Sequence, residues 1–465
     1  MKKSYNQFLI KNILRIHFIA IGGSAMHNLA IALHKKGYKV SGSDDEIFEP
    51  SKSRIAAYDL LPEKFGWNPN KITTDIDAVI LGMHARKDNP ELMKAQELGV
   101  KIYSYPEYIY EQSKNKIRVV IGGSHGKTSI TAMILHVLEK CNFNFDYMVG
   151  AQLDGFDTMV KITDAPLIVL EGDEYLSSPI DRRPKFHLYK PHIALISGIA
   201  WDHINVFPTF QNYVEQFDVF INLIVENGFL TYCQQDDVLN KLVEQNTANI
   251  EKFGYSTPKN HIVDGITYLD TEFGSIALEI FGNHNLQNLT GARLVCNKLG
   301  ISDKEFYSSI SSFKGAAKRL ELIAKNETTA VYKDFAHSPS KLKATTNAVK
   351  QQYPNRKLIA CMELHTFSSL TKEFLKEYKN SMQAADEAYI YYSNNTIEHK
   401  KLASISEQEV KDAFGSTNIT VFTNSTKMVE ALKQQSPSNK VFLLMSSGNF
   451  DGLNLAELGE SLLTF

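Results

Sequence analysis

Short apolar runs alternate with amphipathic stretches along the whole chain, and the pattern restarts three times. The first restart is the run 15–21, followed by glycines and apolar positions at helical spacing. The second is the run 119–121, also followed by glycines and a helical pattern, and the third begins near 330–332. Strands that alternate with helices form mainly parallel sheets, so the pattern predicts an α/β fold.

The length of 465 residues is too great for one hydrophobic core, so several domains are expected. Two polar stretches, 111–116 and 315–320, lie between the repeating patterns and are interpreted as linkers. The predicted domains are 1–115, 116–318 and 319–465.

Composition narrows the function classes. The formal net charge of −2 gives no electrostatic case for nucleic acid or for an anionic membrane surface. No apolar run reaches membrane-spanning length, and Lys11 interrupts the short apolar stretch near the N-terminus that imitates a signal peptide. The four cysteines are scattered, as is typical of buried thiols in a reducing compartment. We therefore expect a cytoplasmic protein without nucleic-acid or membrane partners, and we expect a monomer.

The most informative segment reads VVIGGSHGKTSIT over residues 119–131. It places a glycine loop between a strand and a helix, where loop amides and the helix N-terminus can face phosphate groups. Lys127 would supply a positive charge, and the Thr128 hydroxyl would reach Mg²⁺. The common spacing asks for a glycine where this chain has Ile121, so the phosphate-binding interpretation competes with a chance glycine-rich turn.

Acidic residues follow the next apolar strand, 167–170, beginning with Glu171. An acid at this place can bring a carboxylate to Mg²⁺ beside an ATP phosphate, although acids also end ordinary surface strands. A further strand, 192–197, leads to Trp201-Asp202-His203. His203 is either a second metal ligand or a histidine held by its neighbours.

In the first domain, Gly22-Gly23-Ser24 stands between a strand and a helix, the place where doubly wound sheets bind nucleotides. A second strand ends at Asp44, an acid that can accept hydrogen bonds from a ribose or a uracil. The alternative is a structural turn with a solvated aspartate. Arg86, on the loop 82–86, would meet a phosphate or would simply be solvated.

In the third domain, polar clusters follow three strands, at 334–339, 363–366 and 446–449. The carboxyl ends of parallel strands share one sheet edge, where such sheets bind ligands. Upstream, Asn283 and Asn285 stand before a helix; their amides suit an adenine edge, but the residues alone favour a helix cap.

These motifs together resemble the Mur ligase family over essentially the whole chain. The segments that carry the resemblance are IGGSAMHNLA with GSD, GGSHGKTS, EGDE, WDH, GNHN, KRLE, DFAHSP and MSSGNFDGL. The resemblance implies a Rossmann-like N-terminal domain that binds UDP-N-acetylmuramate, a central P-loop ATPase domain, and a C-terminal Rossmann-like domain that binds the amino substrate. It also implies ATP-dependent amide-bond formation through an acyl phosphate, with ATP and Mg²⁺ as cofactors.

The resemblance assigns roles residue by residue. Catalysis is expected from Lys127, Glu171, His203 and Arg319, and the metal ligands would be Thr128, Glu171 and His203. The residues expected to bind ATP are Gly123, Ser124, His125, Gly126, Lys127, Thr128, Ser129, Asn283, Asn285, Arg319 and Asp334. The residues expected to bind the other substrates are Gly22, Gly23, Ser24, Asp44, His84, Arg86, His337, His365 and Ser446.

The amino substrate depends on the segment 174–186, which is similar to ligases that recycle peptidoglycan by joining UDP-N-acetylmuramate to L-alanyl-γ-D-glutamyl-meso-diaminopimelate, a muropeptide-derived tripeptide. Arg182, Arg183 and Lys185 are candidates for its extra carboxylates, or form a solvated basic loop. Glu363-Leu364-His365 instead resembles the family branch that adds L-alanine during de novo synthesis, which stays open as the alternative. A non-catalytic sensor of cell-wall precursors is the alternative from another class.

Overall fold

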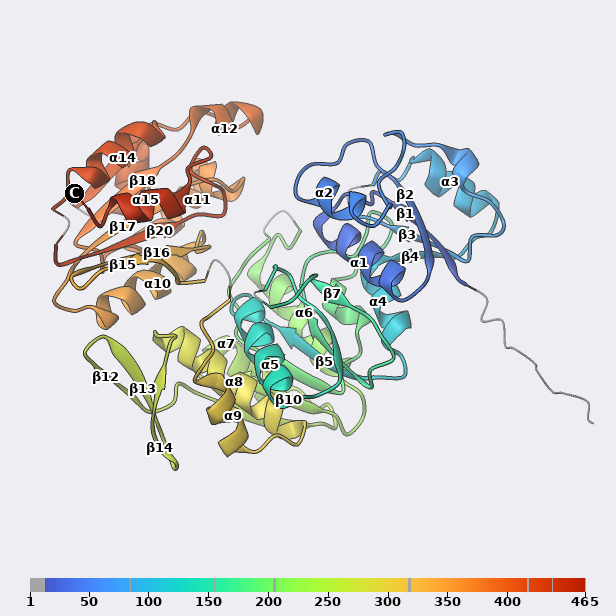
Figure 1. Cartoon of the computed structure of the whole chain (residues 1–465), viewed down its shortest axis with the longest axis horizontal. Helices are drawn as coiled ribbons and strands as arrows, with labels where there is room; N and C mark the ends of the chain where they lie inside the picture. The colour runs from blue at the N-terminus through green and yellow to red at the C-terminus, as the bar shows by residue number, and fades with distance from the viewer. Residues whose placement is uncertain are drawn as a thin grey trace, which may run out of the picture. The chain divides into compact units, whose positions relative to one another are not determined.

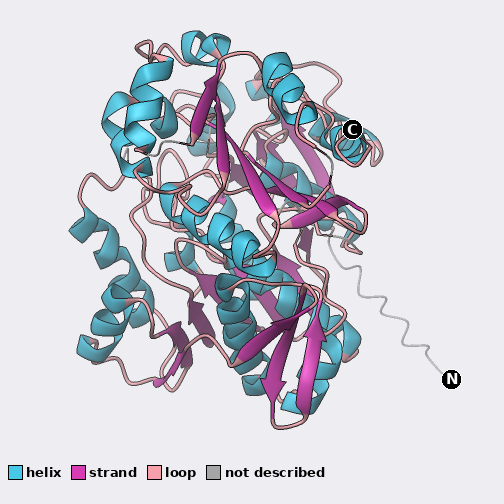
Figure 2. Cartoon of the chain, turned by 90° about the vertical axis from the view of Figure 1, so that its left-hand side faces the viewer, coloured by secondary structure: helices cyan, strands magenta, loops and turns pink. Residues whose placement is uncertain are grey.

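The computed structural model describes residues 13–83, 85–153, 155–203, 206–316, 319–415, 418–436 and 438–464. Helices accompany the sheets, and most strand pairs are parallel, so the predicted α/β class is confirmed (Figure 2). The chain divides into two compact units. The first contains residues up to Lys127 with 142–232 and 237–253, and the second contains 128–141, 233–236 and the chain from Gly254 onward.

The first unit begins with a four-stranded parallel sheet in the order β2-β1-β3-β4 (Figure 1, blue). The predicted strand 15–21 is shorter than expected because the chain turns at Ala20, whose φ is 67°. The elements are β1 (Arg15–Ile19), α1 (Ser24–Lys35), β2 (Lys39–Ser43), α2 (Ser51–Ala56), η1 (Pro69–Lys71), β3 (Ala78–Leu81), α3 (Pro90–Glu97), β4 (Ile102–Ser104) and α4 (Tyr105–Ser113).

A seven-stranded sheet follows, in the order β11-β10-β9-β5-β8-β6-β7. Strand β5 lies in the middle, parallel to β8 and β9, so the loop after β5 starts from a strand that is held on both sides. The elements are β5 (Ile117–Gly122), β6 (Phe145–Met148), β7 (Val160–Lys161), β8 (Leu167–Glu171), η2 (Lys185–Leu188), β9 (Ile193–Ile196), α6 (Phe210–Asn222), β10 (Phe229–Cys233), α7 (Asp237–Gln245) and β11 (Glu251–Tyr255).

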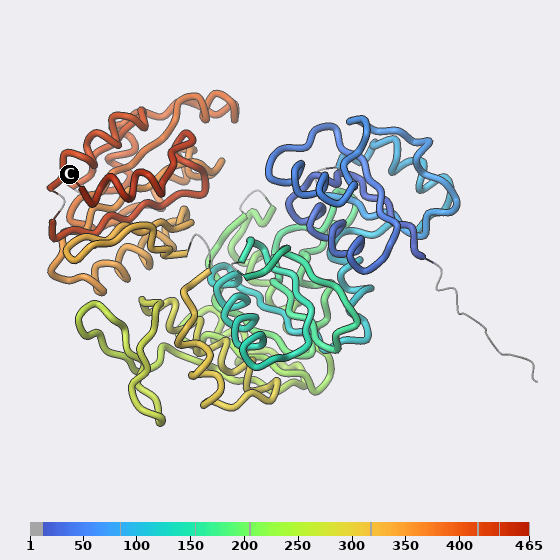
Figure 3. The backbone as a smooth tube through the Cα atoms, in the orientation of Figure 1, coloured from blue at the N-terminus to red at the C-terminus, as the bar shows by residue number. Residues whose placement is uncertain are grey.

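A small antiparallel sheet of three strands lies in the second unit and was not anticipated by the α/β pattern. Its strands alternate poorly in hydrophobicity, and both Ile262 and Ile266 are exposed. Figure 3 shows its backbone as two successive hairpins. This unit also contains three helices of the central region. The elements are α5 (Lys127–Lys140), β12 (Asn260–Val263), β13 (Ile266–Thr271), β14 (Gly274–Leu278), α8 (Asn283–Lys298) and α9 (Asp303–Ile310).

The second unit ends with a six-stranded sheet in the order β15-β16-β20-β17-β18-β19, in which only β15 is antiparallel. The carboxyl ends of β16, β20 and β17 therefore meet at one edge, as predicted. The elements are β15 (Glu321–Lys325), β16 (Thr329–Asp334), α10 (Pro339–Gln352), β17 (Lys357–Glu363), η3 (Ser368–Leu370), α11 (Lys372–Leu375), η4 (Lys376–Tyr378), β18 (Glu387–Tyr391), α12 (Asn394–His399), α13 (Glu407–Phe414), β19 (Ile419–Phe422), α14 (Ser425–Lys433), β20 (Lys440–Met445) and α15 (Leu455–Ser461).

The core of this last sheet explains its apolar strands. Along β20, Val441, Leu443 and Met445 belong to one buried cluster, whereas Phe442 and Leu444 belong to another. Successive side chains of a strand point to opposite faces, so both faces of β20 are covered. Across the described residues, no helix combines the length and the apolar character needed to cross a membrane.

Candidate active site

The loop between β5 and α5 has the backbone geometry that a phosphate-binding loop requires. Gly123 and Gly126 have φ values of 124° and 76°, which side-chain-bearing residues rarely adopt. A Cβ atom at Gly123 would also collide with the side chain of Ser197. The irregular glycine spacing noted in the sequence thus has a structural reason at Gly123.

The end of β9 holds this loop in place. The backbone N–H of Ser124 donates to the carbonyl of Gly198 at 3.0 Å, and that of Ser197 donates to Gly122 at 3.1 Å. The Ser197 hydroxyl donates to the carbonyl of His125. These bonds fix the backbone of the loop, and a fixed loop is the kind of preorganisation that phosphoryl transfer uses.

Lys127, the first residue of α5, is partly buried and makes two short contacts. Its ammonium donates to the carbonyl of Gly123 and to Oε2 of Glu174, each at 2.6 Å. Burial opposes the charge on Lys127, but the carboxylates of Glu174 and Asp173 outweigh it, and the pKa of Lys127 is raised. The lysine therefore stays positively charged at the mouth of the loop.

Asp173 and Glu174 begin a hairpin-like excursion that leaves β8 and returns to η2. The backbone N–H of Phe186 donates to the carbonyl of Asp173, that of Lys185 to Tyr175, and that of Ser177 to Arg183. Lys185 Nζ lies 2.6 Å from Oδ2 of Asp173. Burial raises the pKa of Asp173, but Lys185 and Lys127 lower it more, to about 2, so this carboxylate is ionised.

His203 joins these two acids. One ligand atom from each of Asp173, Glu174 and His203 lies within 4.8 Å of the others. His203 Nε2 is 3.8 Å from Glu174 Oε1, and its φ of 54° shows that the chain turns sharply there. Two carboxylates are the donors that Mg²⁺ prefers, and a cation there would be adjacent to Lys127. The residues fit a magnesium ion.

The predicted acid Glu171 has a different environment from its neighbours. It ends β8 as expected, and its Oε2 accepts the backbone N–H of Gly150 at 2.8 Å. The cluster around His203 instead contains Asp173 and Glu174, which the sequence analysis saw only as part of the same acidic run. Thr128 and Ser129 follow Lys127 on α5 and are buried.

In the N-terminal sheet, Asp44 closes the glycine turn. Its Oδ2 accepts the backbone N–H of Gly22 at 2.7 Å, and its Oδ1 accepts that of Asp45 at 3.0 Å. A Cβ at Gly22 would meet Ile47 at 2.8 Å and Asp44 at 3.0 Å, so this glycine allows the close approach. Asp44 is therefore buried and holds the turn through hydrogen bonds. It is not the solvated aspartate that the alternative interpretation of the sequence predicted.

The remaining first-domain candidates are more exposed. Gly23 precedes the first residue of α1, Ser24, which is exposed. Arg86 is 82% exposed and pairs with Asp88 through Nε and Nη2, so it is engaged with its own loop. His84 lies outside the described residues.

In the C-terminal sheet, Asp334 is buried at the end of β16. Its two oxygens accept the backbone N–H groups of Leu320 at 2.7 Å and Ala336 at 2.6 Å. Burial raises its pKa although Arg319 opposes the shift. The Arg319 guanidinium stacks over the ring of Phe335 at 4.8 Å, and His337 Nδ1 is 2.8 Å from the carbonyl of Phe335. The predicted site residues Arg319, Asp334 and His337 therefore lie together at the end of β16.

Glu363 connects the other two predicted clusters on the same sheet edge. It is buried, it accepts the Ser446 hydroxyl and the Phe450 backbone N–H, and its Oε1 is 3.6 Å from Nδ1 of His365. Burial would raise the pKa of Glu363, but His365 and Ser446 hold it below its usual value. The sequence motifs include Glu363, but only His365 and Ser446 were predicted as site residues.

The helix-cap interpretation of Asn283 and Asn285 was wrong. Helix α8 begins at Asn283 itself, after Gly282 with φ 89°, and no side chain caps it. Asn285 is buried and its amide donates to the carbonyl of Phe281 at 2.9 Å, while Asn283 is exposed. Gly282, which has a positive φ, occupies the N-cap position, so the asparagines do not cap this helix.

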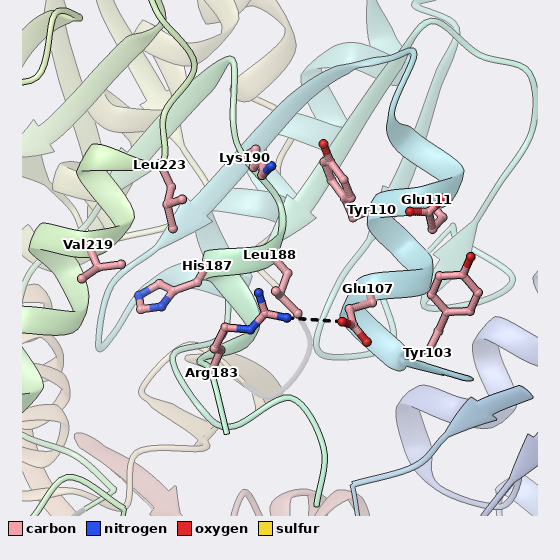
Figure 4. Close-up of a pocket in the computed structure, with 10 residues that line it drawn as sticks. All are labelled: Tyr103, Glu107, Tyr110, Glu111, Arg183, His187, Leu188, Lys190, Val219 and Leu223. Carbon is pink, nitrogen blue, oxygen red and sulfur yellow. Dashed lines mark hydrogen bonds and ion pairs between the residues drawn. The ribbon is translucent and has the colours of Figure 1, made fainter. Parts of the chain in front are cut away.

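The tip of the 173–186 hairpin contacts α4. Arg183 pairs with Asp181 at 2.7 Å and with Glu107 at 3.3 Å, beside a cavity of about 420 Å³ (Figure 4). Arg183 and Lys185 are therefore ion-paired within the protein, whereas Arg182 is exposed. Two of the three basic residues proposed to meet peptide carboxylates already have acidic partners.

A preorganised glycine loop, a charged lysine and an acid cluster define a nucleoside-triphosphate-using α/β enzyme. Three family models match this chain in succession: the Mur ligase family catalytic domain over residues 15–116, the Mur ligase middle domain over 121–296, and the Mur ligase glutamate ligase domain over 318–448. The chain belongs to the Mur ligase family. It is thus an ATP-dependent ligase that forms amide bonds in peptidoglycan synthesis.

Individual relatives agree with the family. The chain is 32% identical over 388 residues to the UDP-N-acetylmuramate–L-alanine ligase of Clostridium kluyveri, covering 80% of this chain and 82% of that protein. Two solved structures share its fold. The UDP-N-acetylmuramate–alanine ligase of Thermotoga maritima has a TM-score of 0.68, 20% identity and coverage of 94% and 96%. The murein peptide ligase of Psychrobacter arcticus has a TM-score of 0.64, 19% identity and coverage of 97% and 99%.

Proposed function

We propose that the protein joins the lactyl carboxylate of UDP-N-acetylmuramate to the amino group of an L-alanine residue, either free or at the head of a peptide. The observation that carries the proposal is the placement of Lys127 against Glu174, with Asp173 and His203 beside it, at the end of a preorganised glycine loop. In a Mur ligase, this is the place for ATP.

The chemistry has two steps. The lactyl carboxylate takes the γ-phosphoryl group from ATP, which forms an acyl phosphate and releases ADP. The amine then attacks the acyl carbon, phosphate leaves with the C–O bond electrons, and the amine loses a proton to give the amide. Both reactants of the first step are anions, so Lys127 offsets their repulsion and the rigid loop aligns them.

Mg²⁺ would supply further charge neutralisation when bound. Asp173, Glu174 and His203 are the residues that would hold it, together with the predicted ligands Glu171 and Thr128. Lys185 keeps Asp173 ionised and oriented for this role.

We assign the three predicted segments accordingly. Residues 1–115 would bind UDP-N-acetylmuramate through the Gly22–Asp44 turn, 116–318 would bind ATP, and 319–465 would bind the amino substrate. The polar edge formed by His337, His365 and Ser446 supports the last assignment. Asn283, Asn285, Arg319 and Asp334 keep their proposed role toward the nucleotide, and we expect a cytoplasmic monomer.

Two amino substrates fit the proposal, and a different observation favours each. The names of the curated relatives favour free L-alanine. The segment 174–186 favours the tripeptide L-alanyl-γ-D-glutamyl-meso-diaminopimelate, although the internal pairing of Arg183 and Lys185 reduces the charge left for its carboxylates. The comparisons support L-alanine more strongly.

A two-substrate assay tests the proposal. The purified chain is given ATP, Mg²⁺ and UDP-N-acetylmuramate with either L-alanine or the tripeptide, and phosphate release and product mass are measured. Product with one amine identifies the substrate. If neither amine stimulates phosphate release, the proposed function is wrong.

A further inference from the structure

Tyr213 is a fully buried residue of α6 that the sequence analysis did not single out. Its ring packs against Phe207 and Phe217, with centroid distances of 5.5 and 5.3 Å. A buried phenol hydroxyl generally needs hydrogen-bond partners. The partners of this hydroxyl come from two different parts of the candidate active site.

The hydroxyl of Tyr213 lies 3.1 Å from Oε1 of Glu174 and 2.8 Å from Oγ of Ser124. The Tyr213 hydroxyl donates its one proton to Oε1 of Glu174. The Ser124 hydroxyl must therefore donate to the oxygen of Tyr213. Ser124 Oγ in turn accepts the backbone N–H of Ala200 at 2.9 Å, which completes a chain of bonds in one direction.

Glu174 is then held from two sides, by Lys127 on Oε2 and by Tyr213 on Oε1. The same hydroxyl holds Ser124, which belongs to the phosphate loop. Ala200, at the other end, belongs to the segment that leads to His203.

We propose that Tyr213 is a positioning residue of the ATP site, whose hydroxyl fixes the phosphate loop and Glu174 at the separation that Mg²⁺ and ATP require. It touches neither ligand itself. The inference rests on the proposed function, because it assumes that this loop and this acid serve ATP.

The test removes one atom. Tyr213→Phe keeps the ring packing and deletes the hydroxyl, which removes the tyrosine donor from Oε1 of Glu174 and the tyrosine acceptor from the Ser124 hydroxyl. Losing a hydrogen bond to a charged group typically costs about ten-fold or more in an equilibrium constant. We expect the dissociation constant of Mg²⁺·ADP, measured by titration calorimetry, to rise about ten-fold, with a similar rise in KM for ATP. The KM for UDP-N-acetylmuramate should change less than about two-fold.

Tyr189→Phe is the matched control. Tyr189 is also fully buried in the same unit, but among the described residues its hydroxyl has no hydrogen-bond partner. This variant should bind Mg²⁺·ADP as the wild type does. Wild-type nucleotide binding by a folded Tyr213→Phe protein would overturn the proposal, as would equal losses for ATP and UDP-N-acetylmuramate.

A second variant tests the directional series of hydrogen bonds from Ser124 through Tyr213 to Glu174. Because Ser124 and Glu174 are joined through one hydroxyl, Ser124→Ala added to Tyr213→Phe should weaken nucleotide binding less than the product of the two single effects. If the two losses of nucleotide affinity multiply in the double variant, the proposed series of hydrogen bonds is wrong. Calorimetry also separates the two proposals. If the wild-type protein binds Mg²⁺·ADP but ligates neither amine, the proposed function is wrong. The effect of Tyr213→Phe on nucleotide binding can still be measured in that case.

Discussion

Two turns in the first unit begin with the same four residues, but side chains of opposite charge contact them. Ile21-Gly22-Gly23-Ser24 and Ile121-Gly122-Gly123-Ser124 both lead from a parallel strand toward a helix. In the first turn, the carboxylate of Asp44 accepts the amide of Gly22. In the second, the ammonium of Lys127 closes the loop against Gly123 and Glu174. The glycines allow the backbone path, and the neighbouring charge decides what the turn can bind.

The largest effect is expected when the charge of the second turn is removed. Lys127→Ala should lower amine-dependent phosphate release about 1,000-fold, because a preorganised group facing the transferred phosphoryl is lost. Release is measured with saturating substrates. Lys190→Ala, an exposed lysine of the same unit, is the control and should retain activity. Activity within ten-fold of wild type for Lys127→Ala would remove the lysine from the reaction.

The acid of the first turn should make the free energy of unfolding depend on pH. Burial raises the pKa of Asp44 from near 3.8 to about 6. Between those values the folded protein holds a proton that the unfolded chain has released, so stability falls as pH rises from about 4 to 6. Each pKa unit corresponds to about 1.4 kcal/mol. Asp44→Asn removes this titration.

Denaturant unfolding of the full chain at pH 4.5, 5.5 and 6.5 measures the effect. The unfolding free energy of Asp44→Asn relative to wild type should increase across this series by up to about 2 kcal/mol. Asp59→Asn, at an exposed position of the same domain, should leave the profile of the wild type unchanged. A constant difference between Asp44→Asn and wild type would show that Asp44 does not titrate in this range.

A third prediction concerns the acids that accompany the second turn only. Asp173→Asn should raise the Mg²⁺ concentration for half-maximal activity about ten-fold, since a carboxylate ligand of the proposed site is replaced by a neutral amide. Asp181→Asn, at the tip of the same hairpin and outside the cluster, is the control. Equal Mg²⁺ requirements in both variants would place the ion elsewhere.

The smallest effect is expected at Arg86, because this side chain already pairs with Asp88 of its own loop. Arg86→Ala should change the KM for UDP-N-acetylmuramate less than about two-fold and leave the unfolding free energy nearly unchanged, since exposed ion pairs contribute little. A ten-fold rise in that KM would show that Arg86 leaves Asp88 to meet the substrate.

Local patterns were sufficient to predict the parallel sheets and the placement of the glycine loop. Val119 to Ile121 form a fully buried central strand, and Lys127 begins a helix, as the spacing indicated. The polar edge of the last sheet also followed from strand ends alone, because the carboxyl ends of parallel strands coincide.

The remaining features of the site could not be predicted, because they depend on contacts between residues that are distant in the sequence. Within the acidic run 171–174, nothing local separates Glu171, which bonds to Gly150, from Glu174, which faces Lys127. Tyr213 has no motif at all, and its role follows only from the fold that brings Ser124 and Glu174 to it. The cap interpretation of Asn283 and Asn285 was wrong because both lie within the first turn of α8 and Gly282 already occupies the cap position.

The hairpin 173–186 has a further consequence for how such enzymes diversify. Its base is closed by the bond between Phe186 and Asp173, and its tip turns between Ser178 and Asp181. Residues at the tip can therefore be inserted, deleted or recharged while the acids at the base keep their positions. An evolving ligase can alter what this protrusion meets without rebuilding the site that handles phosphate.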